Sequence, residues 1–528
     1  MKRACLFALA GLTACAALDI PPARTPYFEQ QLAIARAAPA AGAPAEEAVV
    51  LREAATKLDV RAAAEAERIR RGDETEGLLD VASAPAREFL AKLADPKTAE
   101  EVLATTPLDV ELALLAAYAR SPDVAAARAN WAATVLMYDQ ATYLEDLLLR
   151  YSAFTRLATP RVGAAPMREA AFPYPGLVAL KGEMIDREVT MAREMARMRL
   201  RDVVVATAKA WHVAVHHGEE LKIRDEELSL AKRAAEATRS RVDSGKSPQA
   251  ELLEMEAEIA MTENDREHAV TSLALSRAEL NTLLNRDPQA PIALHEHVHE
   301  TPPDEATPVG PFLAMARKYA PEIRIARAET ARTGAAIRMA EAMLFAAPAP
   351  GAVAPATPMV AAAPASSAGS ASGAMGGAGG AAPMPPSLSP RDEPPGGAPV
   401  AFGPDVAWIS EMKERHVALD RAAEETVKAV ERRVLDAHNE MEAQRRMYVV
   451  AAKSTEPLSA QAVEERLRLY EAGRGDFAGL VVSMRRHLDA AHEAVAARHD
   501  YFMAQAMLWM AIGARPELVR EASEGDTK

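Results

Sequence analysis

The chain of 528 residues has few aromatic residues, only two cysteines and no sustained run of basic residues. Aromatic residues make up 5% of the chain, and its richness in Ala, Glu, Arg and Leu favours long helices and coiled coils over an ordinary enzyme core. The formal net charge of −14, without a concentrated basic surface, argues against binding to nucleic acid. After the N-terminus, no segment offers the roughly 18 consecutive apolar residues of a transmembrane helix.

The N-terminal segment MKRACLFALAGLTAC has the pattern of an export signal, with two basic residues ahead of a short apolar core and small residues. Its last four residues, LTAC, resemble the bacterial lipobox, which implies a lipoprotein signal peptide at residues 1–14 and acylation of Cys15. Ala16 rather than Asp follows this cysteine, and the same sorting rule then implies the outer membrane. An ordinary signal peptide is the alternative. Cys5 would leave with the signal, so the mature chain would contain no disulfide.

The rest of the chain divides into a tether and two similar halves. Residues 15–105 are expected to form an Ala- and Pro-rich tether and an N-terminal helical extension. A first repeat at 106–290, a linker at 291–310, a second repeat at 311–518 and a tail at 519–528 follow.

Two gap-free alignments indicate the duplication. At an offset of 228 (473 − 245), glycine, leucine and proline positions coincide: Gly245 with Gly473, Leu280 with Leu508, and Pro288 with Pro516. At an offset of 199 (321 − 122), the segments around Pro122 and Pro321 match. Because glycine and proline recur at fixed spacing, an internal repeat is favoured over chance similarity between Ala-rich helices.

Each repeat is expected to contain a long antiparallel helical hairpin, the first at about 177–288. The motifs RVDSGKSPQAELL and LYEAGRGDFAGLV interrupt proline-free stretches, and glycine adopts the left-handed backbone of a turn at little cost. Pro248 is expected in the first turn of one returning helix, and Asp476 at the N-cap of the other. Apolar positions three and four apart predict a heptad seam in each returning helix: Leu252, Met255, Ile259, Thr262, Arg266, Ala269, Leu273, Ser276, Leu280 and Leu283; then Val481, Met484, Leu488, Ala491, Val495, Arg498, Phe502, Gln505, Trp509 and Ile512.

With these motifs, and with the phrases LNTLLNRDP and LWMAIGARP that close the two halves, residues 108–516 resemble the TolC family of outer-membrane efflux channels. The segment FPYPG at 172–176 and the helix after it are most similar to the heavy-metal branch. The resemblance implies a mostly α fold in which tandem hairpins from a homotrimer form a periplasmic tube, with a small transmembrane β-barrel. It also implies a periplasmic adaptor protein and an inner-membrane pump as partners, and passive export of small molecules or metal ions.

The sequence departs from the family where the β-barrel is expected. A short β-hairpin region at about 151–176 lacks clear alternation, and a low-complexity Ala/Pro/Gly insertion occupies about 346–403. The strand candidates AMLFA and DVAWIS beside this insertion are shorter than the nine to eleven residues of a spanning strand. The alternative function is therefore a lipid-anchored periplasmic coiled-coil scaffold or tether that no longer conducts. An adaptor protein would need β-rich lipoyl-like segments, which the sequence lacks.

The resemblance places the partner contact at the hairpin tips. The residues expected to touch the adaptor are Gly245, Lys246, Ser247, Gly473, Arg474, Gly475 and Asp476. Plain turns with no contact role are the alternative.

No catalytic motif and no cofactor site is predicted, since the sequence has neither a P-loop, a dinucleotide fingerprint nor a nucleophile elbow. No metal site is assigned either. The alternating His295, His297 and His299 are candidates, because an extended segment would turn all three to one face, but solvated linker histidines are the commoner case. Helix packing is the interpretation preferred for His212 and His216, and core packing for the helical face of Met191, Met195 and Met198.

Overall fold

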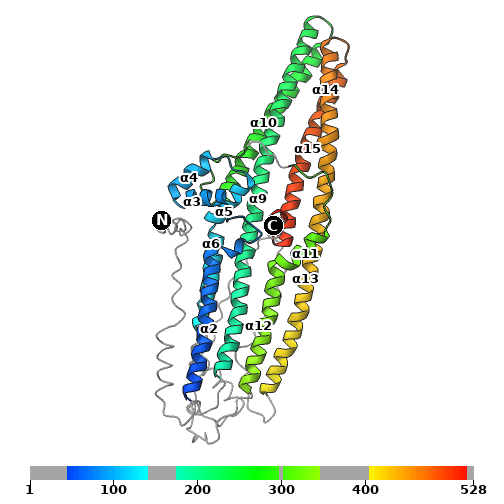
Figure 1. The fold of residues 1–528 in the computed structure, drawn as a ribbon. Coiled ribbons are helices and arrows are strands. Elements are labelled where there is room, and N and C mark those ends of the chain that lie inside the picture. The colour runs from blue at the N-terminus through cyan, green and yellow to red at the C-terminus, as the bar shows by residue number, and fades with distance from the viewer. Residues whose placement is uncertain (1–43, 141–173, 296–300, 345–403, 520–528) are drawn as a thin grey trace, which may run out of the picture.

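The computed structural model describes residues 44–140, 174–295, 301–344 and 404–519, and in these ranges the chain is almost entirely helical. Figure 1 shows an elongated molecule along which one helix, α9 (Tyr174–Asp243), runs from end to end. Its 70 residues span about 105 Å at 1.5 Å per residue. In the described part of the chain, strand pairing is limited to one isolated bridge between Leu108 and Leu294. The predicted mostly α fold is confirmed.

The upper half of the molecule in Figure 1 is a row of helices. The row consists of α10 (Gln249–Leu283), α9, α15 (Phe477–Ile512) and α14 (Glu456–Glu471), which continues from α13 (Pro404–Val450) through a π-helical turn, η4 (Ala451–Thr455). The contacts between neighbouring helices follow this order, so α10 and α14 form the two edges of the row.

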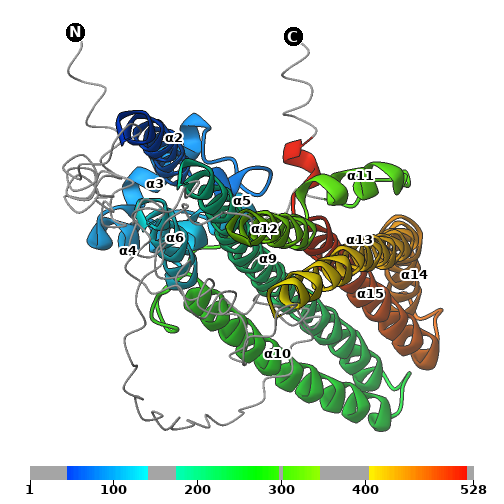
Figure 2. The same cartoon turned by 90° about the horizontal axis from the view of Figure 1, so that it is seen from below.

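In the lower half, the long helices α9 and α13 continue but pack against other helices. There α12 (Pro321–Leu344) packs between α9 and α13, while α2 (Pro44–Arg71), α6 (Pro122–Val135) and α7 (Met137–Gln140) pack on α9 (Figure 2). Trp131 is fully buried among the apolar side chains of α2, α6 and α9. The N-terminal extension therefore belongs to the helical bundle.

Short helices surround the middle of the molecule. They are η2 (Asp73–Thr75), α3 (Ala84–Leu93), α4 (Pro96–Thr105) and α5 (Val110–Arg120) on one side and α11 (Gly310–Tyr319) on the other (Figure 1). The apolar faces of the first group cover α9 and the ends of α10 and α15, where Leu108, Leu200 and Leu280 are fully buried. On the other side, α11 packs on α13 and α15.

A buried ion pair fixes the extension to this middle region. The Glu74 carboxylate is fully buried, 3.0 Å from Nε of Arg128. Burial raises the pKa of Glu74, and the charge of Arg128 opposes that shift. The pair joins η2 to α6, and breaking it would leave a charge without its partner in the interior.

The backbone preserves the internal repeat. Gly245 and Gly473 have φ of 70° and 74°, and Asn285 and Gly513, again 228 residues apart (513 − 285), have φ of 52° and 77°. Asn285 is the one residue other than glycine with positive φ among those the structure describes. In both halves, the returning helix thus ends at an equivalent position with a residue in the left-handed conformation.

The predicted seam of α10 is confirmed at most positions. Seven of its ten members are buried: Leu252, Met255, Thr262, Ala269, Leu273, Ser276 and Leu280. In α15 only five of the ten predicted positions are buried, and the other five are partly exposed: the buried ones are Met484, Leu488, Phe502, Trp509 and Ile512. The seam also misses buried alanines beside it, because α9, α11, α13 and α14 all pack on this helix. The prediction that Met191, Met195 and Met198 pack in the core is wrong for the single chain. Met195 is 41% exposed, and α9 buries Ala196 and Leu200 instead.

Several predictions concern residues outside the described ranges. These are the signal peptide with Cys15, the β-hairpin region up to residue 173 and the insertion at 346–403. The strand candidate DVAWIS is wrong, since it lies in the first turns of α13, and AMLFA is helical up to the end of α12 at Leu344. Among the described helices, none is both long and apolar enough to span a membrane.

Candidate partner-docking site at the hairpin tips

The two hairpin turns have the same hydrogen-bond pattern. At the end of α9, the Gly245 N–H donates to the Val242 carbonyl at 2.9 Å, and the Lys246 N–H donates to the Arg241 carbonyl at 2.8 Å. At the end of α14, Gly473 donates to Tyr470 at 3.0 Å and Arg474 to Leu469 at 2.9 Å. Both are Schellman motifs, in which glycine supplies the left-handed residue that ends the helix.

The returning helices begin differently. Asp476 is the N-cap of α15, and its carboxylate accepts the Gly479 N–H at 2.7 Å, as predicted. Pro248 is itself the N-cap of α10, one residue before the first turn in which it was predicted, because its ψ of 151° is extended. Gly475 has a steric role: a β-carbon there would lie 2.9 Å from the Tyr470 nitrogen.

Arg241 and Tyr470 join the two tips. Arg241 of α9 donates to the Tyr470 carbonyl at 3.1 Å and to Oγ of Ser247 at 3.0 Å. Its guanidinium also lies over the Tyr470 ring, 4.4 Å from the centroid. Tyr470 is fully buried, and its hydroxyl lies 3.1 Å from Oγ1 of Thr238. The ends of the two repeats are therefore held together as one surface.

Sequence reasoning missed this contact, because Arg241 and Tyr470 lie in different repeats and no spacing rule connects them. The available signal was compositional. Aromatic residues are rare in this chain, and a tyrosine three residues before a predicted turn glycine indicates a packing role at the tip.

The predicted contact residues divide into exposed and packed ones. Gly245, Lys246, Gly473, Arg474 and Asp476 are exposed. No atom lies within 4 Å of where a β-carbon of Gly245 would stand. Ser247 and Gly475 are partly buried, the first by Arg241 and the second by α14. The predicted contact residues thus present bare backbone, two cations and one carboxylate to solvent.

Of the three predicted metal candidates, the structure describes only His295. His295 lies in the extended segment beside Leu108, where its N–H donates to the Leu108 carbonyl at 3.1 Å, while His297 and His299 fall outside the described residues. The packing interpretation of His212 is confirmed, since its ring is buried and stacks on Phe502 with centroids 4.6 Å apart.

Comparison with known protein families and with curated proteins finds no match. Solved structures do match. The outer membrane protein VceC from the bacterial pathogen Vibrio cholerae is 12% identical, aligns over 77% of this chain and 96% of its own, and has a TM-score of 0.52. The outer-membrane channel OprN gives 13% identity, coverage of 81% and 92%, and a TM-score of 0.50. CusC, whose structures concern transmembrane channel formation, is 12% identical, aligns over 78% of this chain and 93% of its own, and has a TM-score of 0.51. The described part of the chain therefore has the helical fold of outer-membrane channel proteins, which is the helical part of the fold that its resemblance to the TolC family predicts.

Proposed function

We propose that this protein is the outer-membrane exit duct of a tripartite efflux system. The observation that carries the proposal is the pair of equivalent hairpin tips at one end of a fold that aligns over 96% of VceC. The duct would be anchored through acylated Cys15 and would extend into the periplasm. It would pass small molecules or metal ions without catalysis, and the inner-membrane pump would supply the energy.

A homotrimer is supported by apolar side chains left exposed on both edges of the upper row. At 1.5 Å per residue from Gln249, Met261 on α10 lies about 18 Å below the tip and is 64% exposed. On α14, Leu458 lies about 20 Å below Glu471 and is 65% exposed.

The correspondence continues further down both edges. Val270 on α10 and Val450 on α13 both lie 21 residues below their tips (270 − 249 and 471 − 450), and both are exposed. Two different edges with apolar groups at matching heights suit a head-to-tail contact between copies, which closes a ring when the rotation per copy allows it.

The adaptor contact is proposed for the exposed tip residues, Gly245 and Lys246 in one repeat and Gly473, Arg474 and Asp476 in the other. The two glycines there leave room for a partner helix or loop to approach closely. Because Arg241 joins the tips, a partner would meet both repeats as one rigid surface.

Cross-linking tests the ring. In the M261C/L458C double variant, oxidation should give a ladder of one, two and three chains in a denaturing gel, because the two edges of adjacent copies meet. Each single variant serves as the control and should stay at one chain. Absence of cross-links in the double variant would contradict the ring and favour the lipid-anchored scaffold or tether without a lumen. A ladder beyond three chains would contradict the trimer.

A further inference from the structure

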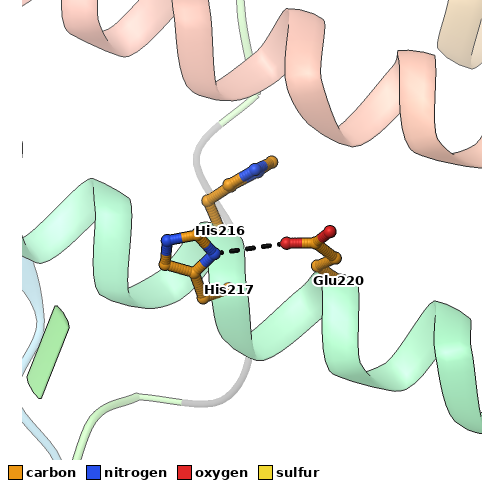
Figure 3. A group of neighbouring side chains, drawn as sticks. All are labelled: His216, His217 and Glu220. Atoms are coloured by element: carbon orange, nitrogen blue, oxygen red, sulfur yellow. Dashed lines mark hydrogen bonds and ion pairs between the residues drawn. The ribbon is translucent and has the colours of Figure 1, made fainter. Parts of the chain in front are cut away.

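A group of metal-ligating side chains lies on α9, well below the tips and apart from the proposed docking surface. His216, His217 and Glu220 each offer one ligand atom, and these atoms lie within 4.8 Å of one another. Figure 3 shows the three side chains on the side of α9 that faces α15, with His217 and Glu220 joined by a contact of 3.2 Å. Spacings of three and four residues place them on neighbouring turns of one helix face.

A third imidazole, which would be the fourth ligand, approaches from α15. The ring of His499 lies 4.7 Å from the ring of His216, centroid to centroid. Nδ1 of His499 is held by the Asp500 carboxylate at 3.1 Å, which leaves Nε2 as the free ligand atom. A carboxylate behind a histidine is the usual support for a metal ligand, since it fixes the tautomer and the orientation of the ring.

Two nitrogens of this group are buried without a hydrogen-bond partner in the described structure, namely Nδ1 of His216 and Nε2 of His499. Buried polar atoms normally have partners, and a cation bound between the two rings would supply one to both.

We propose that His216, His217 and Glu220 of α9 and His499 of α15 bind one divalent transition-metal ion. Three imidazoles and a carboxylate suit zinc, copper or nickel rather than calcium or magnesium. In a tetrahedral zinc site with bonds near 2 Å the ligand atoms lie about 3.3 Å apart. The three ligand atoms of α9, which lie within 4.8 Å of one another, would close in on binding, and the ring of His499, which lies outside that group, would move toward them. All four residues are only partly buried, which leaves a path for the ion.

The site would join the two repeats, because α9 belongs to the first and α15 to the second. A neighbouring ion pair between Glu219 and Arg498 lies on the same helix pair. The ion would therefore stabilise the α9–α15 contact inside one chain. This role depends only on that contact and goes beyond the proposed export function.

Calorimetric titration of the detergent-extracted, EDTA-treated full-length protein with ZnSO₄ tests the site. We expect one equivalent of Zn²⁺ per chain, a higher melting temperature with zinc, and the visible absorption of a tetrahedral ion when Co²⁺ is used. H216A and H499A should each lower the affinity at least 100-fold. The matched control is H268A, which removes an exposed histidine of α10 and should bind zinc as the wild type does.

The isosteric E220Q variant guards against misfolding, because it removes one ligand charge and leaves the packing intact. It should also weaken binding, with an unchanged melting temperature in the absence of metal. Wild-type protein that binds no zinc, or H216A and H499A variants that bind it like H268A, would overturn the proposal. Binding is read without any transport assay, so this outcome is independent of the exit-duct function.

Discussion

Replacing Arg241 with alanine should loosen both hairpin tips at once. The substitution removes the hydrogen bond from a charged donor to the Tyr470 carbonyl, a type worth about 1.5–3 kcal/mol. It also removes the contact with the Tyr470 ring, worth about 0.5–1 kcal/mol at a partly exposed site. Since Arg241 is partly exposed, we take roughly 2 kcal/mol as the local loss, at the low end of these ranges.

Hydrogen exchange read by mass spectrometry measures this loss directly. A local destabilisation of roughly 2 kcal/mol accelerates exchange about 30-fold where exchange proceeds by local opening. We expect that acceleration in peptides covering 238–250 and 467–480, and none in the middle of α9. R241K should fall between wild type and R241A, because lysine retains the charge and loses the forked N–H groups.

R239A is the control for R241A. Arg239 is two residues away and pairs with Glu256 at 3.1 Å, but both side chains are well exposed, and such a pair contributes about 0–1 kcal/mol. If R241A exchanged no faster than R239A, or if only the α9–α10 tip responded, the two tips would be independent and the reasoning would be refuted.

Three further predictions concern the tips, the anchor and the N-terminal extension. In G245V and G473V, a β-branched residue at positive φ costs about 1–2 kcal/mol and reshapes the turn, so efflux should be lost while export to the outer membrane persists; unchanged efflux would remove the tip role. C15S should lack the acyl group in mass spectrometry, and an unmodified Cys15 in the wild type would refute the lipid anchor. W131A should lower the free energy of unfolding by about 3–5 kcal/mol in a denaturant titration, because Trp131 is fully buried between α2, α6 and α9; a loss below about 1 kcal/mol would show that the extension is not part of the core.

The returning helix α10 was predictable because it packs mainly on one neighbour. Its buried positions recur three and four residues apart, and polar Thr262 and Ser276 are buried at seam positions as the heptad requires. In α15 the same periodicity named only part of the core. Four helices surround it, so buried alanines such as Ala490 and Ala497 lie between the seam positions and show no contrast in hydrophobicity.

The turns were also predictable from local chemistry, since glycine at a helix end and aspartate before a helix start carry their own geometric signal. The contacts between the repeats were not. Arg241 meets Tyr470, and His216 meets His499, across more than 200 residues of chain. Only the packing of α9 beside α14 and α15 brings such residues together, and no periodicity within one segment encodes it.

Electron microscopy of the detergent-extracted protein tests the central claim most directly. We expect a particle with three-fold symmetry, a central lumen and a helical tube about 100 Å long, as the 70 residues of α9 require. Slender rods or single chains without a lumen would contradict the exit duct. They would mean that the fold of a channel has been kept for a lipid-anchored scaffold.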